Sequence, residues 1–157
     1  MLNLIYPWQK NPSKIAKAKK SLTETRMMTH QAINAELPNT LNDSPCLDVS
    51  ILAGFLDDDN PLEIIDFLTV FQIEATKITA EIIAGIRAEQ SDVVFEAAHQ
   101  LKSSAYTVGA LALRDLCAAL EVAGRVGDLA TMHTLLPRFE RAWIATNSHI
   151  ERHLSLA

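Results

Sequence analysis

The feature that most constrains this chain is a run of apolar residues spaced by three and four positions. Between residues 61 and 90 they are Ile64, Leu68, Phe71, Ala75, Ile78, Ile82 and Ile86. Because an α-helix completes a turn in about 3.6 residues, this spacing places all of them on one face. Pro61 stands at the start, where the first turn of a helix tolerates proline. The pattern predicts one long helix with a single buried face.

Two further helices are predicted on either side of this one. Asp48 can cap a short helix over 49–56, which an acidic turn at 57–60 then ends. After the long helix, Ser91 and Asp92 are expected to cap a third helix. Its inward residues are Val94, Ala98, Leu101, Ala105 and Val108.

The rest of the chain shows the same periodicity. Gly109 interrupts the pattern, and a fourth helix follows, which Gly124 to Gly127 are expected to end. Its inward residues are Leu113, Leu116, Cys117, Leu120 and Ala123. Asp128 can cap a last helix, whose apolar residues are Leu129, Met132, Leu136, Phe139, Trp143 and Ile150.

These elements predict an all-α protein. The connections between the helices are short, and short connections make successive helices antiparallel neighbours. We therefore expect an antiparallel up-down four-helix bundle with an additional N-terminal helix or extension. Residues 1–45 contain four of the six prolines and lack a sustained pattern, so they are interpreted as an extension or linker, with a possible helix over 13–36. Residues 46–157 are expected to form the bundle domain.

Charge is unevenly distributed along the chain. Residues 1–30 hold six Lys or Arg and one acid, so they carry +5, whereas the net charge of the whole chain is −5. The remainder is therefore strongly acidic, which argues against nucleic-acid binding by the domain itself. The basic segment is interpreted as a solvated tail, the alternative being contact with an anionic membrane or nucleic acid.

Cysteine usage and hydropathy point to a cytoplasmic protein. Cys46 and Cys117 do not form a spaced motif, and Cys117 lies in an apolar stripe, so it is expected to be a buried hydrophobe. No apolar run is long enough to span a membrane. The first apolar stretch is also too short for a signal peptide.

The segment that can carry chemistry begins at His99. The buried stripe of the third helix uses 98, 101 and 105, so His99 falls at its border. Lys102, Ser103 and Tyr106 follow at the third, fourth and seventh positions and share its partly exposed face. A neutral imidazole nitrogen is a nucleophile near neutral pH, and a cation one turn away can stabilise phosphoryl oxygens. This face therefore suits a phosphorylated histidine.

The wider string closely resembles the histidine-phosphotransfer (HPt) family. That family has a His followed by Leu-Lys-Gly, then small residues, Gly-Ala and Leu-Cys-x-x-Leu-Glu. The resemblance covers roughly residues 47–154. It implies that His99 is the phosphoacceptor, that Lys102 lies beside the phosphoryl group, and that Gly109 and Ala110 form the turn behind the site. Leu116, Cys117, Leu120 and Glu121 match the scaffold of the next helix.

One position departs from the family pattern. Ser103 stands where the family usually has glycine, one turn from the histidine, where a partner's active site needs room. Serine adds only a hydroxymethyl group. We therefore expect docking to survive with a changed partner preference, and Ser103 to support the phosphoryl group with its hydroxyl.

The resemblance implies a histidine phosphotransfer protein of a two-component phosphorelay. His99 would accept a phosphoryl group from a receiver-domain aspartate and pass it to another receiver. The partners would be receiver domains of a hybrid sensor kinase or a response regulator. Such a protein is a phosphoryl carrier rather than a self-sufficient enzyme, without a cofactor of its own; Mg²⁺ is expected in the receiver. We expect a monomer. The alternative is a non-catalytic helical module that binds a receiver or another signalling protein.

The other histidines are weaker candidates. His149 and His153 lie four positions apart, which could place two metal ligands on one helix face. No Cys or acidic pair completes such a site in the sequence, so no metal site is predicted.

Overall fold

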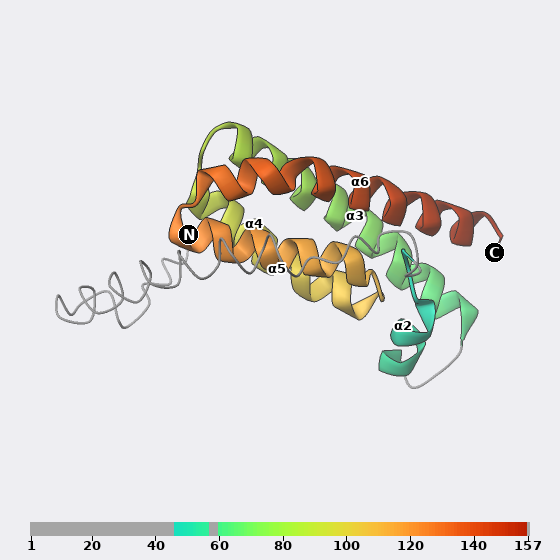
Figure 1. Ribbon diagram of the computed structural model, residues 1–157. Helices are drawn as coiled ribbons and strands as arrows, with labels where there is room; N and C mark the ends of the chain where they lie inside the picture. Colours follow the sequence, from blue (N-terminus) through green and yellow to red (C-terminus); the bar gives the residue numbers. More distant parts are fainter. Residues whose placement is uncertain (1–45, 57–59, 157) are drawn as a thin grey trace, which may run out of the picture. The chain divides into compact units, whose positions relative to one another are not determined.

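Every regular element in the part of the chain that the structure describes is an α-helix. The computed structural model describes residues 46–56 and 60–156. Its helices are α2 (Val49–Leu56), α3 (Pro61–Arg87), α4 (Ser91–Thr107), α5 (Leu111–Val126) and α6 (Leu129–Ser155) (Figure 1). The predicted all-α class is confirmed for these residues. The predicted extension over 1–45, with its possible helix at 13–36, lies outside them.

Side-chain caps start three of the five helices. The Asp48 carboxylate accepts the backbone N–H of Ser50, the Asn60 side chain accepts that of Leu62, and Asp128 accepts that of Thr131. The prediction that Ser91 and Asp92 cap α4 is wrong. Ser91 is already helical, and Gln90 occupies the cap position without a side-chain hydrogen bond. The reason is the tight turn after α3, in which the N–H of Gln90 donates to the carbonyl of Gly85.

The four long helices contact one another in a closed cycle. α3 packs on α4, α4 on α5, α5 on α6 and α6 back on α3, while α2 contacts α3 and α4 (Figure 1). The predicted inward residues of α3 and α4 are all buried, as are those of α5. In α6 the predicted inward residues Met132, Phe139 and Ile150 are buried. At two other positions the buried residue is one place earlier, because Leu135 and Ala142 are buried and Leu136 and Trp143 are only half-buried, as is Leu129. None of the described helices is long and apolar enough to cross a membrane.

Gly109 joins the start of α2 to the turn between α4 and α5. Its φ is +76°, in the left-handed region that favours glycine. A Cβ built at this position would lie 2.0 Å from the carbonyl oxygen of Asp48. The carbonyl of Gly109 in turn accepts the N–H of Asp48 at 3.0 Å. Only glycine permits this approach, which fixes the C-terminal end of α4.

Gly124 brings α5 close to α4. It had been expected to help end α5, but it lies inside the helix, which ends at Val126 with Gly127 as its C-cap. A Cβ on Gly124 would lie 2.8 Å from the backbone nitrogen of Phe95 and from the carbonyl oxygen of Ser91. The absent side chain therefore lets the two helix backbones come into contact one turn before His99.

We predict that Gly124→Ala destabilises the protein. The added methyl group meets backbone atoms, so the helices must separate at a cost of about 1–3 kcal/mol. Urea denaturation followed by circular dichroism measures this loss. Gly54→Ala is the matched control, because a Cβ at that helical position meets nothing within 4 Å. A Gly124→Ala protein as stable as the Gly54→Ala protein would contradict the close approach.

Candidate functional site

His99 lies in the middle of α4 with its side chain open to solvent. The side chain is 59% exposed. Its neighbours Ala98, Leu101 and Ala105 are all completely buried. His99 is one position away from the buried stripe and is therefore exposed, as predicted, so that another protein can reach it.

A buried carboxylate on α5 holds one nitrogen of the His99 ring. Nδ1 of His99 lies 2.9 Å from Oε1 of Glu121, whose side chain is only 6% exposed. An ionised carboxylate only accepts hydrogen bonds, so Nδ1 carries the proton and donates it. In the neutral ring the lone pair is then on Nε2. The contact selects the tautomer and leaves Nε2 as the nucleophilic atom.

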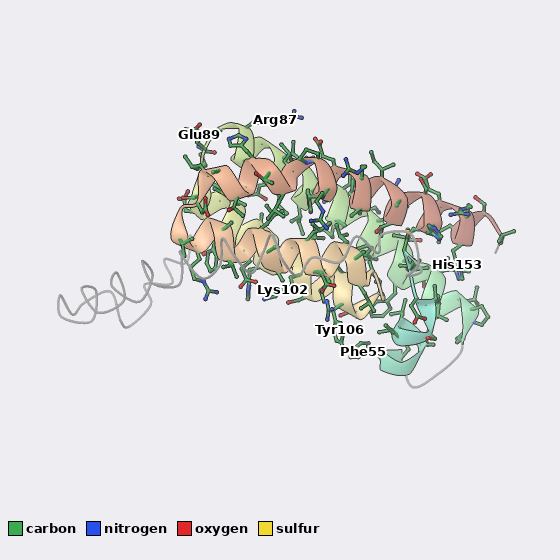
Figure 2. The ribbon with its side chains drawn as sticks, viewed as in Figure 1. Phe55, Arg87, Glu89, Lys102, Tyr106 and His153 are labelled. Atoms are coloured by element: carbon green, nitrogen blue, oxygen red, sulfur yellow. The ribbon has the colours of Figure 1, made fainter. Side chains whose placement is uncertain are left out.

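Two cations share the same carboxylate. Nζ of Lys102 donates to Oε2 of Glu121. Nη2 of Arg125, one turn further along α5, donates to Oε1 at 3.2 Å. Lys102 is thus one helical turn from His99 and connected to it through Glu121, on a side of the bundle visible in Figure 2. The buried negative charge is compensated on both oxygens, as a buried ion requires.

These contacts change the acidity of Glu121. Burial alone raises the pKa of this carboxyl, but the hydrogen bonds and charges of Lys102 and His99 outweigh it and lower the pKa below its ordinary value. Glu121 is therefore ionised at neutral pH. The Cys117 thiol, also on α5, is buried, and burial raises its pKa, with the nearby Glu121 charge adding to the effect. That thiol stays protonated and unreactive.

An aromatic ring covers part of the His99 side chain. The rings of Phe95 and His99 are stacked, with centroids 6.3 Å apart and an interplanar angle of 29°. Phe95 precedes His99 by one helical turn. The guanidinium of Arg125 lies 5.1 Å from the centroid of the Phe95 ring. Phe95 and Arg125 belong to the surroundings of His99, although the sequence analysis assigned them no part in the site.

Ser103 and Tyr106 extend the same exposed face towards the C-terminal end of α4. Ser103 is exposed one turn after His99. Tyr106 is 46% exposed, and its ring meets the Phe55 ring of α2 edge-on at 5.9 Å. Figure 2 shows Phe55 beside Tyr106, on the side of the bundle that also carries Lys102. The structure thus places all the predicted site residues on one face.

Glu121 is the main residue of the candidate site whose contact with His99 the sequence did not predict. It was assigned to the scaffold of the helix after the site, and no contact with His99 was predicted. A signal was present, since Glu121 follows Leu120 and lies one turn after Cys117, within the buried stripe of α5. Glutamate is almost never buried without a partner, so this position indicated an ion pair.

In the described ranges, His, Cys, Asp and Glu side chains nowhere form a group of three that could hold a metal ion. His149 and His153 both lie on α6, and no acidic or cysteine side chain joins them in such a group there.

Comparison with known proteins assigns the chain to a family. The sequence model of the Hpt domain matches residues 66–151, which is more than half of the chain, so the chain belongs to the Hpt domain family. Among solved structures it is similar to histidine-containing phosphotransfer protein B (HptB) from Pseudomonas aeruginosa PAO1. The two are 22% identical with a TM-score of 0.66, over 73% of this chain and 99% of that one. This likeness shows a shared fold. No curated protein sequence matches the chain.

We predict that Glu121 makes stability depend on pH. A carboxyl whose pKa is lowered by folding stabilises the folded state above its ordinary pKa of 4.5. That contribution is lost as the pH falls through the lowered folded value. Glu121→Gln removes the charge, so it should cost about 1–3 kcal/mol at pH 7 and progressively less below pH 4.5. Urea denaturation of both proteins from pH 7 to pH 3 tests this, and a constant difference would contradict it.

Proposed function

We propose that this protein is a phosphoryl carrier of a two-component phosphorelay. His99 accepts a phosphoryl group from an aspartate of one receiver domain and passes it to an aspartate of another. The observation that carries the proposal is the exposed His99 ring whose Nδ1 is held by the buried Glu121. Membership of the Hpt domain family supports it, because Hpt domains work with receiver domains in phosphorelays. The name of the similar HptB structure also agrees with it.

The transfer requires little from this chain beyond an oriented nucleophile. Nε2 of His99 attacks the phosphorus, the P–N bond forms, and the P–O bond to the receiver's aspartate breaks as its carboxylate leaves with the electron pair. No proton has to move, because Nδ1 keeps its hydrogen bond to Glu121 throughout. The ring gains positive charge, which the carboxylate of Glu121 balances. The reverse step delivers the group to the next receiver.

Lys102 and Ser103 act on the phosphoryl group in this proposal. Lys102 is one turn from His99, so its ammonium can turn from Glu121 to the phosphoryl oxygens. The exposed hydroxyl of Ser103 offers a donor on the same face and leaves room for a receiver. Mg²⁺ and the acidic residues that assist transfer belong to the receiver, and the carrier needs no cofactor of its own.

The finer details of organisation are also proposals. The closed cycle of helix contacts and the short connections support an antiparallel up-down four-helix bundle. We propose that it acts as a monomer, since one chain contains the complete set of groups around His99. Exchange with receiver domains implies a cytoplasmic location.

We predict that His99→Gln abolishes phosphoryl transfer. Glutamine keeps a polar side chain of similar length but lacks the nucleophilic nitrogen. Incubation with a radiolabelled phospho-receiver should label the wild type with acid-labile phosphate and leave His99→Gln unlabelled. His133→Gln, an exposed histidine on α6, is the matched control and should label normally. Equal labelling of the His99→Gln protein would refute the proposal, and failure of every receiver to label the wild type would favour the interaction module.

The receiver must cover the surface around His99. A typical interface buries about 800 Å² on each partner, which corresponds to a disc of roughly 16 Å radius. Tyr106 is seven residues from His99, or about 10.5 Å along the helix axis, and Phe55 touches it. Phe55 is 56% exposed and Tyr106 is 46% exposed. We propose that this aromatic pair forms part of the apolar centre of the docking surface.

We predict that Phe55→Ser weakens receiver docking. Loss of an exposed aromatic anchor should raise the receiver concentration that gives half-maximal transfer by about tenfold, with little change in the maximal rate. Rapid-quench measurement of transfer over a range of receiver concentrations separates the two quantities. Ile144→Ser is the control, because Ile144 is 63% exposed on α6, which occupies the position opposite α4 in the cycle of helices. The same effect from both substitutions would contradict this docking surface.

A further inference from the structure

Four side chains, one of them His99, form a closed ring of contacts. Glu121 holds Nδ1 at 2.9 Å, and Phe95 stacks on the ring at 6.3 Å between centroids. Arg125 contacts both Glu121 and Phe95 and so connects them to each other. Its Nη2 donates to Oε1 of Glu121 at 3.2 Å, and its guanidinium carbon lies 5.1 Å from the Phe95 centroid. Two elements contribute, since Phe95 and His99 belong to α4, and Glu121 and Arg125 to α5.

The two contacts of Arg125 depend on the shape of its side chain. A guanidinium is planar, so it can donate hydrogen bonds in its plane while placing a face against an aromatic ring. The ammonium of lysine is a point charge and cannot do both in this way. Arg125 is exposed at 57% of its side chain, so it makes these contacts at the surface and is not required to fill the core.

The contacts restrict the two ways in which the His99 ring can move. The hydrogen bond from Nδ1 restricts rotation of the imidazole about the Cβ–Cγ bond of His99. The Phe95 ring beside it limits tilting of the imidazole plane. Transfer from a second protein needs Nε2 in line with the breaking P–O bond, and a small misplacement can cost a large factor in rate. A group that holds both Glu121 and Phe95 therefore acts on the reacting nitrogen without touching it.

We propose that Arg125 is a positioning residue for phosphoryl transfer, which fixes the His99 ring through Phe95 and Glu121. This inference rests on the proposed function, in which Nε2 of His99 accepts the phosphoryl group. Arg125 has no bonding role in the transfer. Its contribution is to keep Nε2 in the attacking direction while a receiver is bound.

The test compares Arg125→Lys with the wild type in rapid-quench transfer from a phosphorylated receiver. Arg125→Lys keeps the charge and loses the guanidinium that contacts Glu121 and the Phe95 ring together, so the maximal rate should fall about three- to tenfold at unchanged half-saturating receiver concentration. Arg87→Lys is the matched control, because Arg87 also donates to a glutamate at 3.2 Å but pairs with Glu140 on α6. That variant should transfer at the wild-type rate. Equal thermal midpoints for all three proteins exclude a general loss of stability.

A double-mutant cycle with Phe95→Leu tests the route of the effect. If Arg125 acts through the ring of Phe95, the fall in the maximal rate of the double variant, relative to the wild type, should be smaller than the product of the two single-variant falls. Multiplicative effects, a wild-type maximal rate for Arg125→Lys, or a change confined to the half-saturating concentration would each overturn the inference. The proposed function has its own test, and it fails if the His99→Gln protein is labelled as strongly as the wild type. If the Arg125→Lys protein transfers at the wild-type rate, only the positioning role of Arg125 is refuted.

Discussion

The buried carboxylate of Glu121 connects the two helices that carry the candidate site. It lies on α5, where its side chain is 6% exposed, and it accepts hydrogen bonds from His99, Lys102 and Arg125. An unpaired charge would not be stable in this position, and these three donors compensate it. The same contact that makes the carboxylate tolerable also fixes the tautomer of His99. Stability and reactivity of the site therefore depend on one interaction.

That interaction requires α4 and α5 to lie close together where His99 faces Glu121. Gly124 permits the approach beside Phe95 and Ser91, and Gly109 fixes the turn between the two helices against Asp48. The apolar stripes of both helices then supply the packing that holds their spacing. The small residues are thus part of the site's construction, although neither touches the imidazole.

Helical periodicity predicted most of this fold, because the apolar stripes are long and regular. It also predicted the exposure of His99, because a residue next to a buried position is rotated by about 100° around the helix axis, away from the buried face. It could not predict which residues meet across helices. Glu121 is separated from His99 by 22 positions, and its contact depends on helix spacing and rotation that no local pattern specifies. The misplaced cap at Ser91 comes from the tight turn after α3, whereas the two shifted positions in α6 come from tertiary contacts, which decide between adjacent residues.

In the proposed transfer, Glu121 holds Nδ1 and leaves Nε2 of His99 to accept the phosphoryl group. Long-range ¹H–¹⁵N NMR correlation of histidine-labelled protein, before and after phosphorylation by a receiver, observes both nitrogens directly. We expect a protonated Nδ1 in His99 before transfer and a phosphorylated Nε2 afterwards. A phosphoryl group on Nδ1 of His99, or on any other histidine, would contradict it.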